Sequence, residues 1–298
     1  MSNQSETPKG IQRVVKLPER GLADLWKSIV VDEGIKSRLV SQAIVNFTVR
    51  SKVSRTVLPL HGAILLVGQP GTGKTSLARG LANEVATLMS KAGFHLLEVD
   101  PHALGSAMMG KTQKAVSELF SQTVAEAAGR GPVIVLLDEV ETLAVDRSKL
   151  SMDANPVDVM RATDAVLVQL DALAEQFSNI LFIATSNFPQ AVDAAFTSRC
   201  DLVLEVPLPN RDACEQILTE CLTALGQTFQ GIEKLPMEKG FKAVVEQAVG
   251  LDGRTLRKVV ANALAFRKEV AVEPTKLTLA DLAESLVMAQ AVRRKGNQ

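Results

Sequence analysis

The sequence predicts an α/β protein, in which a five-stranded parallel sheet is flanked by helices and followed by a small all-helical domain. Five short segments are apolar almost throughout, which is typical of strands buried on both faces. Longer segments with an apolar period near 3.6 residues separate them, and this alternation favours a parallel, doubly wound sheet. The predicted strands are Ala63–Val67, His95–Val99, Val133–Leu137, Ile180–Thr185 and Leu202–Val206.

The helices expected between these strands follow from the same periodicity. They cover Thr75–Ser90, Gln113–Ala128 and Pro156–Phe177. Ahead of the first strand, a helical pattern runs from about Leu22 to Thr48. Residues 1–20, which begin with a polar stretch over Met1–Lys9 and contain Pro8 and Pro18, are expected to form a flexible leader.

The character of the chain changes after Pro207 and Pro209, because only helical patterns follow. Thr278 and Asp281 form a variant of the capping box before the last of these helices. The predicted organisation is therefore a leader over 1–20, a large α/β domain over 21–209 and a helical domain over 210–298. The expected helices of the last domain are Ala213–Leu225, Phe241–Val249, Leu256–Glu269 and Leu279–Arg294.

Composition excludes several classes of protein. Apolar residues make up 46% of the 298 residues, which is ample for a core. Lys plus Arg and Asp plus Glu number 33 each, and this balance disfavours nucleic-acid binding by the whole chain. No apolar run approaches the roughly 20 residues of a membrane helix. The three cysteines form no C-x-x-C pair, which fits a reducing cytoplasm.

A phosphate-binding loop follows the first predicted strand. The segment from Gly68 to Thr75 satisfies G-x-x-x-x-G-K-[ST], and a helix is expected to begin near Lys74. Its glycines let backbone N–H groups face phosphate oxygens, Lys74 reaches the β and γ phosphates, and the Thr75 hydroxyl is a ligand for Mg²⁺. ATP and Mg²⁺ are therefore the expected cofactors. The nucleotide-binding residues predicted here are Gly68, Pro70, Gly71, Thr72, Gly73, Lys74, Thr75 and Ser76.

Two carboxylates, Asp138 and Glu139, end the third predicted strand. In enzymes with such a loop, an Asp at this place holds the Mg²⁺ shell. A neighbouring carboxylate orients and deprotonates the attacking water. The alternative is that both acids only favour the positive end of a following helix.

At this point the chain resembles the AAA+ ATPases, and within them the pachytene-checkpoint-two family, known in animals as thyroid hormone receptor interactor thirteen. The resemblance runs from about residue 17 to the C-terminus. Its most specific element is Gly250-Leu-Asp-Gly-Arg254-Thr-Leu-Arg-Lys258. The other segments that carry it are Gly71-Thr-Gly-Lys-Thr-Ser-Leu, Asp138-Glu-Val-Glu-Thr-Leu-Ala, Ala165-Val-Leu-Val-Gln-Leu-Asp171, Thr185-Ser-Asn187 and Asp193-Ala-Ala-Phe-Thr-Ser-Arg199-Cys-Asp.

The resemblance implies roles for further residues. Asn187 matches the sensor that positions the attacking water, and Arg199 matches the finger that reaches the γ-phosphate of a neighbouring subunit. Arg254 matches a second sensor at the start of a lid helix, and Ile29 and Val30 are expected to flank the adenine. Plainer structural roles stay open for three of them: a turn for Asn187, a surface salt bridge for Arg199 and helix capping for Arg254.

The expected substrate-gripping loop departs from the family pattern. Met108 and Met109, followed by Gly110, stand where animal relatives carry aromatic residues. Methionine is flexible and polarizable, so the loop is still suited to grip an extended chain in a central pore. The alternative is a pair of buried core methionines. Residues 147–158 are either a second pore loop or a solvated connection.

The resemblance implies a homohexameric ATPase that engages and partly unfolds a HORMA-domain protein. Only about 20 residues precede the ATPase core here, as in compact bacterial members from operons for cyclic-oligonucleotide antiphage signalling (CBASS). The expected role there is to take the HORMA protein from its complex with a cyclic-oligonucleotide synthase. Two alternatives stay open: a nucleotide-switched loader or scaffold on DNA, and a generic unfoldase that feeds a protease.

Overall fold

The computed structural model describes residues 8–89, 93–101, 112–146 and 156–296. The chain forms two compact units. The first consists of residues 1–68 and 74–206, and the second of residues 69–73 and 207–298.

The first unit is built on a six-stranded sheet with the order β1-β3-β4-β5-β2-β6. Every neighbouring pair is parallel except β1 with β3. The predicted parallel strands are confirmed, and their ends differ from the prediction by one residue at most. The strands are β1 (Ile11–Lys16), β2 (Ala63–Val67), β3 (His95–Val99), β4 (Val133–Leu137), β5 (Ile180–Ser186) and β6 (Leu202–Glu205).

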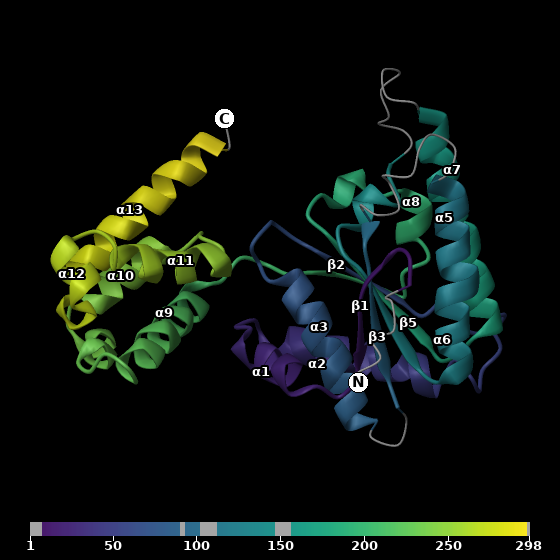
Figure 1. Ribbon diagram of the computed structural model, residues 1–298, viewed down its shortest axis with the longest axis horizontal. Coiled ribbons are helices and arrows are strands. Elements are labelled where there is room, and N and C mark those ends of the chain that lie inside the picture. Colours follow the sequence, from purple (N-terminus) through teal and green to yellow (C-terminus); the bar gives the residue numbers. More distant parts are fainter. Residues whose placement is uncertain (1–7, 90–92, 102–111, 147–155, 297–298) are drawn as a thin grey trace, which may run out of the picture. The chain divides into compact units, whose positions relative to one another are not determined.

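Helices cover both faces of this sheet, with α2 and α3 on one face and α5, α6 and α7 on the other (Figure 1). Side chains of β2 alternate between two hydrophobic clusters, because successive residues of a strand point to opposite faces. Ala63, Leu65 and Val67 join one cluster, whereas Ile64 and Leu66 join the other. The helices of this unit are α1 (Arg20–Ser28), α2 (Glu33–Thr48), α3 (Lys74–Leu88), α5 (Thr112–Glu118), α6 (Ala125–Arg130), α7 (Pro156–Gln176) and α8 (Ala194–Thr197).

The predicted flexible leader over 1–20 is wrong in its second half, because Ile11–Lys16 forms strand β1 at the edge of the sheet. Ile11 and Val15 are buried, and the strand pairs antiparallel with β3. The sheet therefore gains an antiparallel edge strand that the five-strand prediction did not include.

Two helical predictions also need correction. The pattern from Leu22 to Thr48 is two helices, since α1 ends at Ser28 and Asp32 caps α2 through a bond from the Gly34 N–H. The pattern over Gln113–Ala128 is α5 and α6 joined by the π-helical segment Leu119–Val124.

From Pro207 to Gly296, the second unit consists of helices joined by turns, with no strand among its described residues. The predicted capping box forms, because Thr278 donates its N–H and its hydroxyl to Asp281 Oδ2 (2.9 and 2.7 Å) and Asp281 N–H donates back (3.3 Å). The pattern over Leu256–Glu269 is broken into two helices. The helices are α9 (Arg211–Gly226), α10 (Phe241–Ala248), α11 (Gly253–Ala263), α12 (Lys268–Val272) and α13 (Leu279–Gly296).

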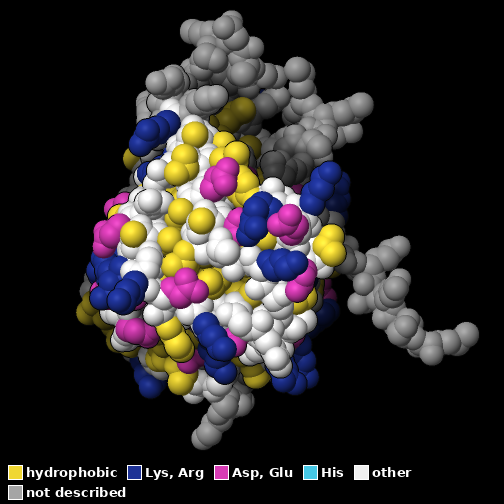
Figure 2. Space-filling model, turned by 90° about the vertical axis from the view of Figure 1, so that its left-hand side faces the viewer, with side chains coloured by type: hydrophobic (Ala, Val, Ile, Leu, Met, Phe, Trp, Pro, Cys, Tyr) yellow, Lys and Arg dark blue, Asp and Glu magenta, His cyan; other side chains and the backbone are white. Residues whose placement is uncertain are grey.

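Side chains of both charges are interspersed with hydrophobic ones on the face shown in Figure 2. A single-sign stripe of the kind that follows a phosphate backbone is not seen on that face. Among the described residues, no helix is both long and apolar enough to pass through a lipid bilayer.

Candidate active site

The phosphate loop connects the end of β2 to the start of α3, as the sequence predicts. Gly71 and Gly73 adopt positive φ angles of 83° and 92°, which glycine reaches without strain. Lys74, the first residue of α3, is 5% exposed, and its ammonium group donates to the Gly68 carbonyl (2.8 Å). The charge is thus held at the loop that a triphosphate would enter, together with the positive end of α3.

The predicted Mg²⁺ residues, Thr75 and Asp138, lie side by side. The Thr75 hydroxyl donates to Asp138 Oδ1 (2.8 Å), although 63 residues separate them. A hydroxyl and a carboxylate are the hard oxygen donors that Mg²⁺ prefers, alongside phosphate oxygens and waters. The residues therefore fit the cation that the sequence predicts.

A third side chain, Thr185 near the end of β5, completes this network. Its hydroxyl donates to Asp138 Oδ1 (2.5 Å) and accepts the backbone N–H of Glu139 (3.2 Å). Thr185 is 1% exposed, so both bonds are shielded from water. Thr185 is not among the site residues predicted from the sequence, although its place two residues before Asn187 in the same motif is the signal that points to it.

Glu139 has a left-handed backbone, with φ 50° and ψ 54°. Such a conformation costs of order 1–3 kcal/mol for a residue other than glycine and is characteristic of functional sites. The Glu139 side chain is exposed, and its Oε1 accepts a bond from Asn187 Nδ2 (3.3 Å). The predicted base and the predicted sensor are therefore in contact, so a water bound to the Glu139 carboxylate would also lie within reach of Asn187.

Glu141 holds the backbone of the predicted sensor, Asn187. Its Oε1 accepts the backbone N–H of Asn187 (3.0 Å), which fixes the turn after β5. Its Oε2 is buried and has no hydrogen-bond partner within the structure as described. Glu141 is likewise absent from the site residues predicted from the sequence.

Arg199 lies at the opposite end of the sheet from the phosphate loop. It precedes β6, whose Leu202 is level with Ile64 of β2, whereas Gly68 lies four residues further along β2. At about 3.3 Å per strand residue, Leu202 lies about 13 Å before the level of Gly68 along the sheet, and Arg199 precedes Leu202. Its guanidinium group is held by Asp171 of α7 through two bonds, from Nε (2.9 Å) and Nη2 (2.7 Å).

Arg254 is the second residue of α11, behind the N-cap Asp252. Its backbone N–H donates to the Gly71 carbonyl (3.3 Å) within the second unit, and its side chain is exposed. Ile29 and Val30 follow α1 and are half-buried, and Ile29 packs against a core cluster. Met108, Met109, Gly110 and most of the second predicted pore loop lie outside the described residues.

The phosphate loop, the two carboxylates and Asn187 form the arrangement that the sequence predicts for a nucleoside triphosphatase. The comparison with protein families gives its class. The model of the ATPase family associated with various cellular activities (AAA) matches residues 64–208, from β2 to just beyond β6. The protein is an AAA ATPase.

Within the AAA ATPases, the family of this chain is identified by a relative that is similar to it over its whole length. The protein is 63% identical over 297 residues to CD-NTase-associated protein 6 of Pseudomonas aeruginosa, which covers 100% of this chain and 98% of that protein. The chain therefore belongs to the family of CD-NTase-associated protein 6.

Two solved structures share the fold. PCH-2 of C. elegans has a TM-score of 0.74 and 25% identity, over 97% of this chain and 77% of that chain. A chain of the HORMA:CdnC:Trip13 complex of E. coli MS115-1 also has a TM-score of 0.74, with 19% identity over 93% of this chain and 94% of that chain. The resemblance to the pachytene-checkpoint-two family is confirmed.

Proposed function

We propose that the protein uses ATP hydrolysis to engage and partly unfold a HORMA-domain protein, and so separates it from a cyclic-oligonucleotide synthase. This activity restrains antiphage signalling in the bacterial cytoplasm. Two facts support the proposal. The chain is 63% identical to a CD-NTase-associated protein over its full length, and it shares its fold with a chain of the HORMA:CdnC:Trip13 complex.

The proposal that the protein hydrolyses ATP rests on one observation, a continuous series of hydrogen bonds across the site. The bonded residues are Thr75, Asp138, Thr185, Glu139 and Asn187. Mg²⁺ held by Thr75 and Asp138 neutralises charge on the phosphates when it is bound. Lys74 binds the phosphate oxygens as a point charge. Asn187 and Glu139 orient a water, and the Glu139 carboxylate accepts its proton as the water attacks the γ-phosphate.

We also propose that the active unit is a homohexamer in which Arg199 acts on the neighbouring subunit. Within its own chain Arg199 lies at the wrong end of the sheet for the phosphate loop, as the strand register shows. An arginine supplied in trans stabilises charge that develops on the transferred phosphoryl group. Hydrolysis then depends on assembly. In the same hexamer we expect Met108 and Met109 to line the pore and Arg254 to contact the nucleotide.

The two alternative functions have less support. A DNA loader needs a concentrated positive surface, but the chain has zero net charge and the face in Figure 2 mixes both signs. Salt-dependent DNA binding by the purified protein would favour it. A generic unfoldase predicts stimulation of a partner peptidase.

The test is a trap variant. Glu139→Gln should bind ATP but hydrolyse it slowly, because the amide cannot accept the proton from water. Pull-down of Glu139→Gln with ATP from the native lysate, followed by mass spectrometry, is expected to recover a HORMA-domain protein and its synthase. The matched control is Lys74→Ala with Glu139→Gln, which should not hold ATP. Equal recovery of the HORMA protein with both variants, or no recovery with either, would contradict ATP-gated engagement.

A further inference from the structure

Asp171 and Arg199 form an ion pair at the edge of the first unit. Asp171 lies in the last turns of α7, and Arg199 lies in the turn between α8 and β6. The two carboxylate oxygens each accept one guanidinium N–H, at 2.9 and 2.7 Å. An arginine that makes two such bonds to one carboxylate forms the strong type of charged hydrogen bond, which constrains direction as well as distance. The orientation of the guanidinium is therefore set by α7.

The pair leaves part of Arg199 available. A guanidinium group has five N–H donors, and Arg199 uses two on Asp171 and one, on Nη1, on the Ala195 carbonyl (2.8 Å). One N–H on each terminal nitrogen has no acceptor within the structure as described. Two such donors form a fork that matches two phosphate oxygens. The Arg199 side chain is 25% exposed, so the group is only partly covered.

The surroundings keep both charges in place. The bonds from Arg199 hold the pKa of Asp171 below its ordinary value, and Asp171 raises the pKa of Arg199 in turn. His61 Nε2 lies 3.6 Å from Asp171 Oδ1, but burial lowers the His61 pKa, so this ring is neutral at neutral pH. Arg199 therefore makes the strongest interaction with the Asp171 carboxylate, and Arg55 adds a weaker electrostatic attraction.

We propose that Asp171 is a positioning residue, which holds Arg199 in the orientation that presents its free fork to the γ-phosphate of a neighbouring subunit. This inference rests on the proposed role of Arg199 in trans. A carboxylate that sequestered Arg199 would have the opposite effect, since its removal would then raise the rate. The donor arrangement favours positioning, because the side edge of the guanidinium meets Asp171 and one donor stays on each terminal nitrogen.

The test is a double-mutant cycle on steady-state ATP hydrolysis, with Asp171→Asn, Arg199→Ala and the double variant. Asp171→Asn is expected to lower kcat about tenfold with KM for ATP unchanged, since a misplacement of the order of 1 Å is costly in a catalytic group. In the Arg199→Ala background, Asp171→Asn is expected to have no further effect, because Asp171 acts only through Arg199. Asp171→Glu, which keeps the charge, should have a kcat between those of Asp171→Asn and the wild type.

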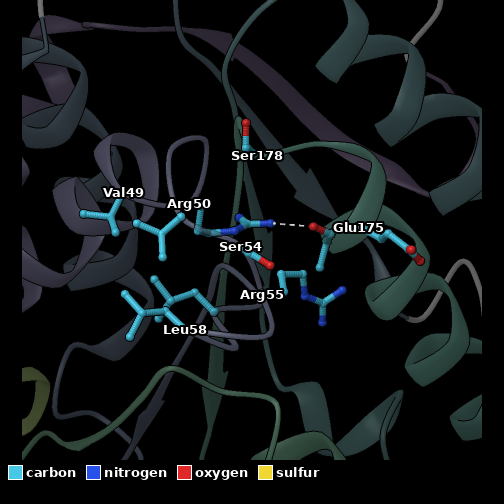
Figure 3. Close-up of a pocket in the computed structure, with 10 residues that line it drawn as sticks. Val49, Arg50, Ser54, Arg55, Leu58, Glu175 and Ser178 are labelled. Atoms are coloured by element: carbon cyan, nitrogen blue, oxygen red, sulfur yellow. Dashed lines mark hydrogen bonds between the residues drawn. The ribbon is translucent and has the colours of Figure 1, made fainter.

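The matched control is Glu175→Gln, one turn further along α7. Glu175 is exposed and lines a separate cavity of about 220 Å³ with Arg50 and Arg55, where Arg50 donates to the Ala174 carbonyl (Figure 3). Its removal should leave kcat unchanged. Thermal denaturation of each variant identifies any loss of folding. If Asp171→Asn does not fold, the kcat of Asp171→Glu relative to the wild type tests the positioning role instead.

Three results would overturn the inference: an unchanged kcat for Asp171→Asn, an increased kcat, or an equal further loss in the Arg199→Ala background. If Asp171→Asn leaves kcat unchanged while Arg199→Ala is slow, the positioning role of Asp171 is wrong but the proposed role of Arg199 in trans stands. A wild-type rate for Arg199→Ala would instead remove the proposed finger itself.

Discussion

Replacing Thr185 by valine tests the network that joins Asp138, the proposed Mg²⁺ ligand, to Glu139, the proposed catalytic base. Valine keeps the shape of threonine but has no hydroxyl, so the substitution removes the bond to Asp138 (2.5 Å) and the acceptor of the Glu139 N–H (3.2 Å). A hydrogen bond to a charged group contributes about 1.5–3 kcal/mol, and an unpaired N–H costs about 1 kcal/mol or more. The free energy of unfolding should therefore fall by about 3 kcal/mol.

The same substitution should slow hydrolysis. Glu139 keeps its left-handed backbone against a cost of order 1–3 kcal/mol, and the bond to Thr185 is one of the contacts that hold it there. Without that bond the carboxylate moves away from Asn187, and kcat is expected to fall by about 100-fold. The loss of about 3 kcal/mol of unfolding free energy should also lower Tm. At about 2–4 °C per kcal/mol for a domain of this size, the expected fall is about 6–12 °C.

Steady-state ATPase assays and thermal denaturation measure both effects. Thr185→Ser, which retains the hydroxyl, should preserve most of the rate. Thr163→Val is the matched control, because Thr163 is equally buried but makes only a long bond of 3.5 Å to the Leu143 carbonyl. A Thr185→Val enzyme whose kcat and Tm match those of Thr163→Val would refute the reasoning.

Three further predictions concern other parts of the chain. Lys74→Ala should lose ATP affinity by at least about tenfold in a direct binding titration, because the buried ammonium is the loop's point charge for phosphate; unchanged affinity would contradict the loop assignment. The double substitution Met108→Ala, Met109→Ala should leave basal ATPase within about twofold but abolish remodelling, and surviving remodelling would favour core methionines. Bonds from Arg267 and Thr278 lower the pKa of Asp281 to about 2, so its contribution to stability is complete above about pH 4 and disappears as the pH falls towards 2. Urea unfolding should show Asp281→Asn about 1–2 kcal/mol less stable than the wild type at pH 7, since Arg267 is 43% exposed and the pair is partly screened, and the difference should shrink below pH 4.

The central sheet was predictable because its strands are buried on both faces. Val133–Leu137, for example, is buried at every position and is apolar at every position. Strand β1 was missed for the opposite reason. As an edge strand it buries only Ile11 and Val15, and the register shifts between Ile11 and Arg13, which disrupts the alternation that identifies a strand.

The site was predictable where a motif contains its own chemistry. The loop from Gly68 to Thr75 and the pair Asp138 and Glu139 are local in sequence, and the structure brings Thr75 and Asp138 into contact. Asp171 carries no such local signal, since it is one acid in a helix and its partner is 28 residues away. Contacts of this kind depend on how α7 packs beside the turn before β6, which no periodicity specifies.

The strand order explains why Thr185 links the components of the site. Strand β5 lies between β2, which leads into the phosphate loop, and β4, which is followed directly by Asp138 and Glu139. Leu137 of β4 is level with Ala184, and Val67 of β2 is level with Ser186, so Thr185 falls between the ends of both neighbours. Parallel strands meet the ligand at their carboxyl ends, and the middle strand alone touches both sides. A hydroxyl at this one position therefore holds Asp138 and the Glu139 backbone together, and it precedes the sensor by two residues. A movement of the turn at Asn187 should consequently shift both Asp138 and Glu139, because Thr185 is hydrogen-bonded to each of them.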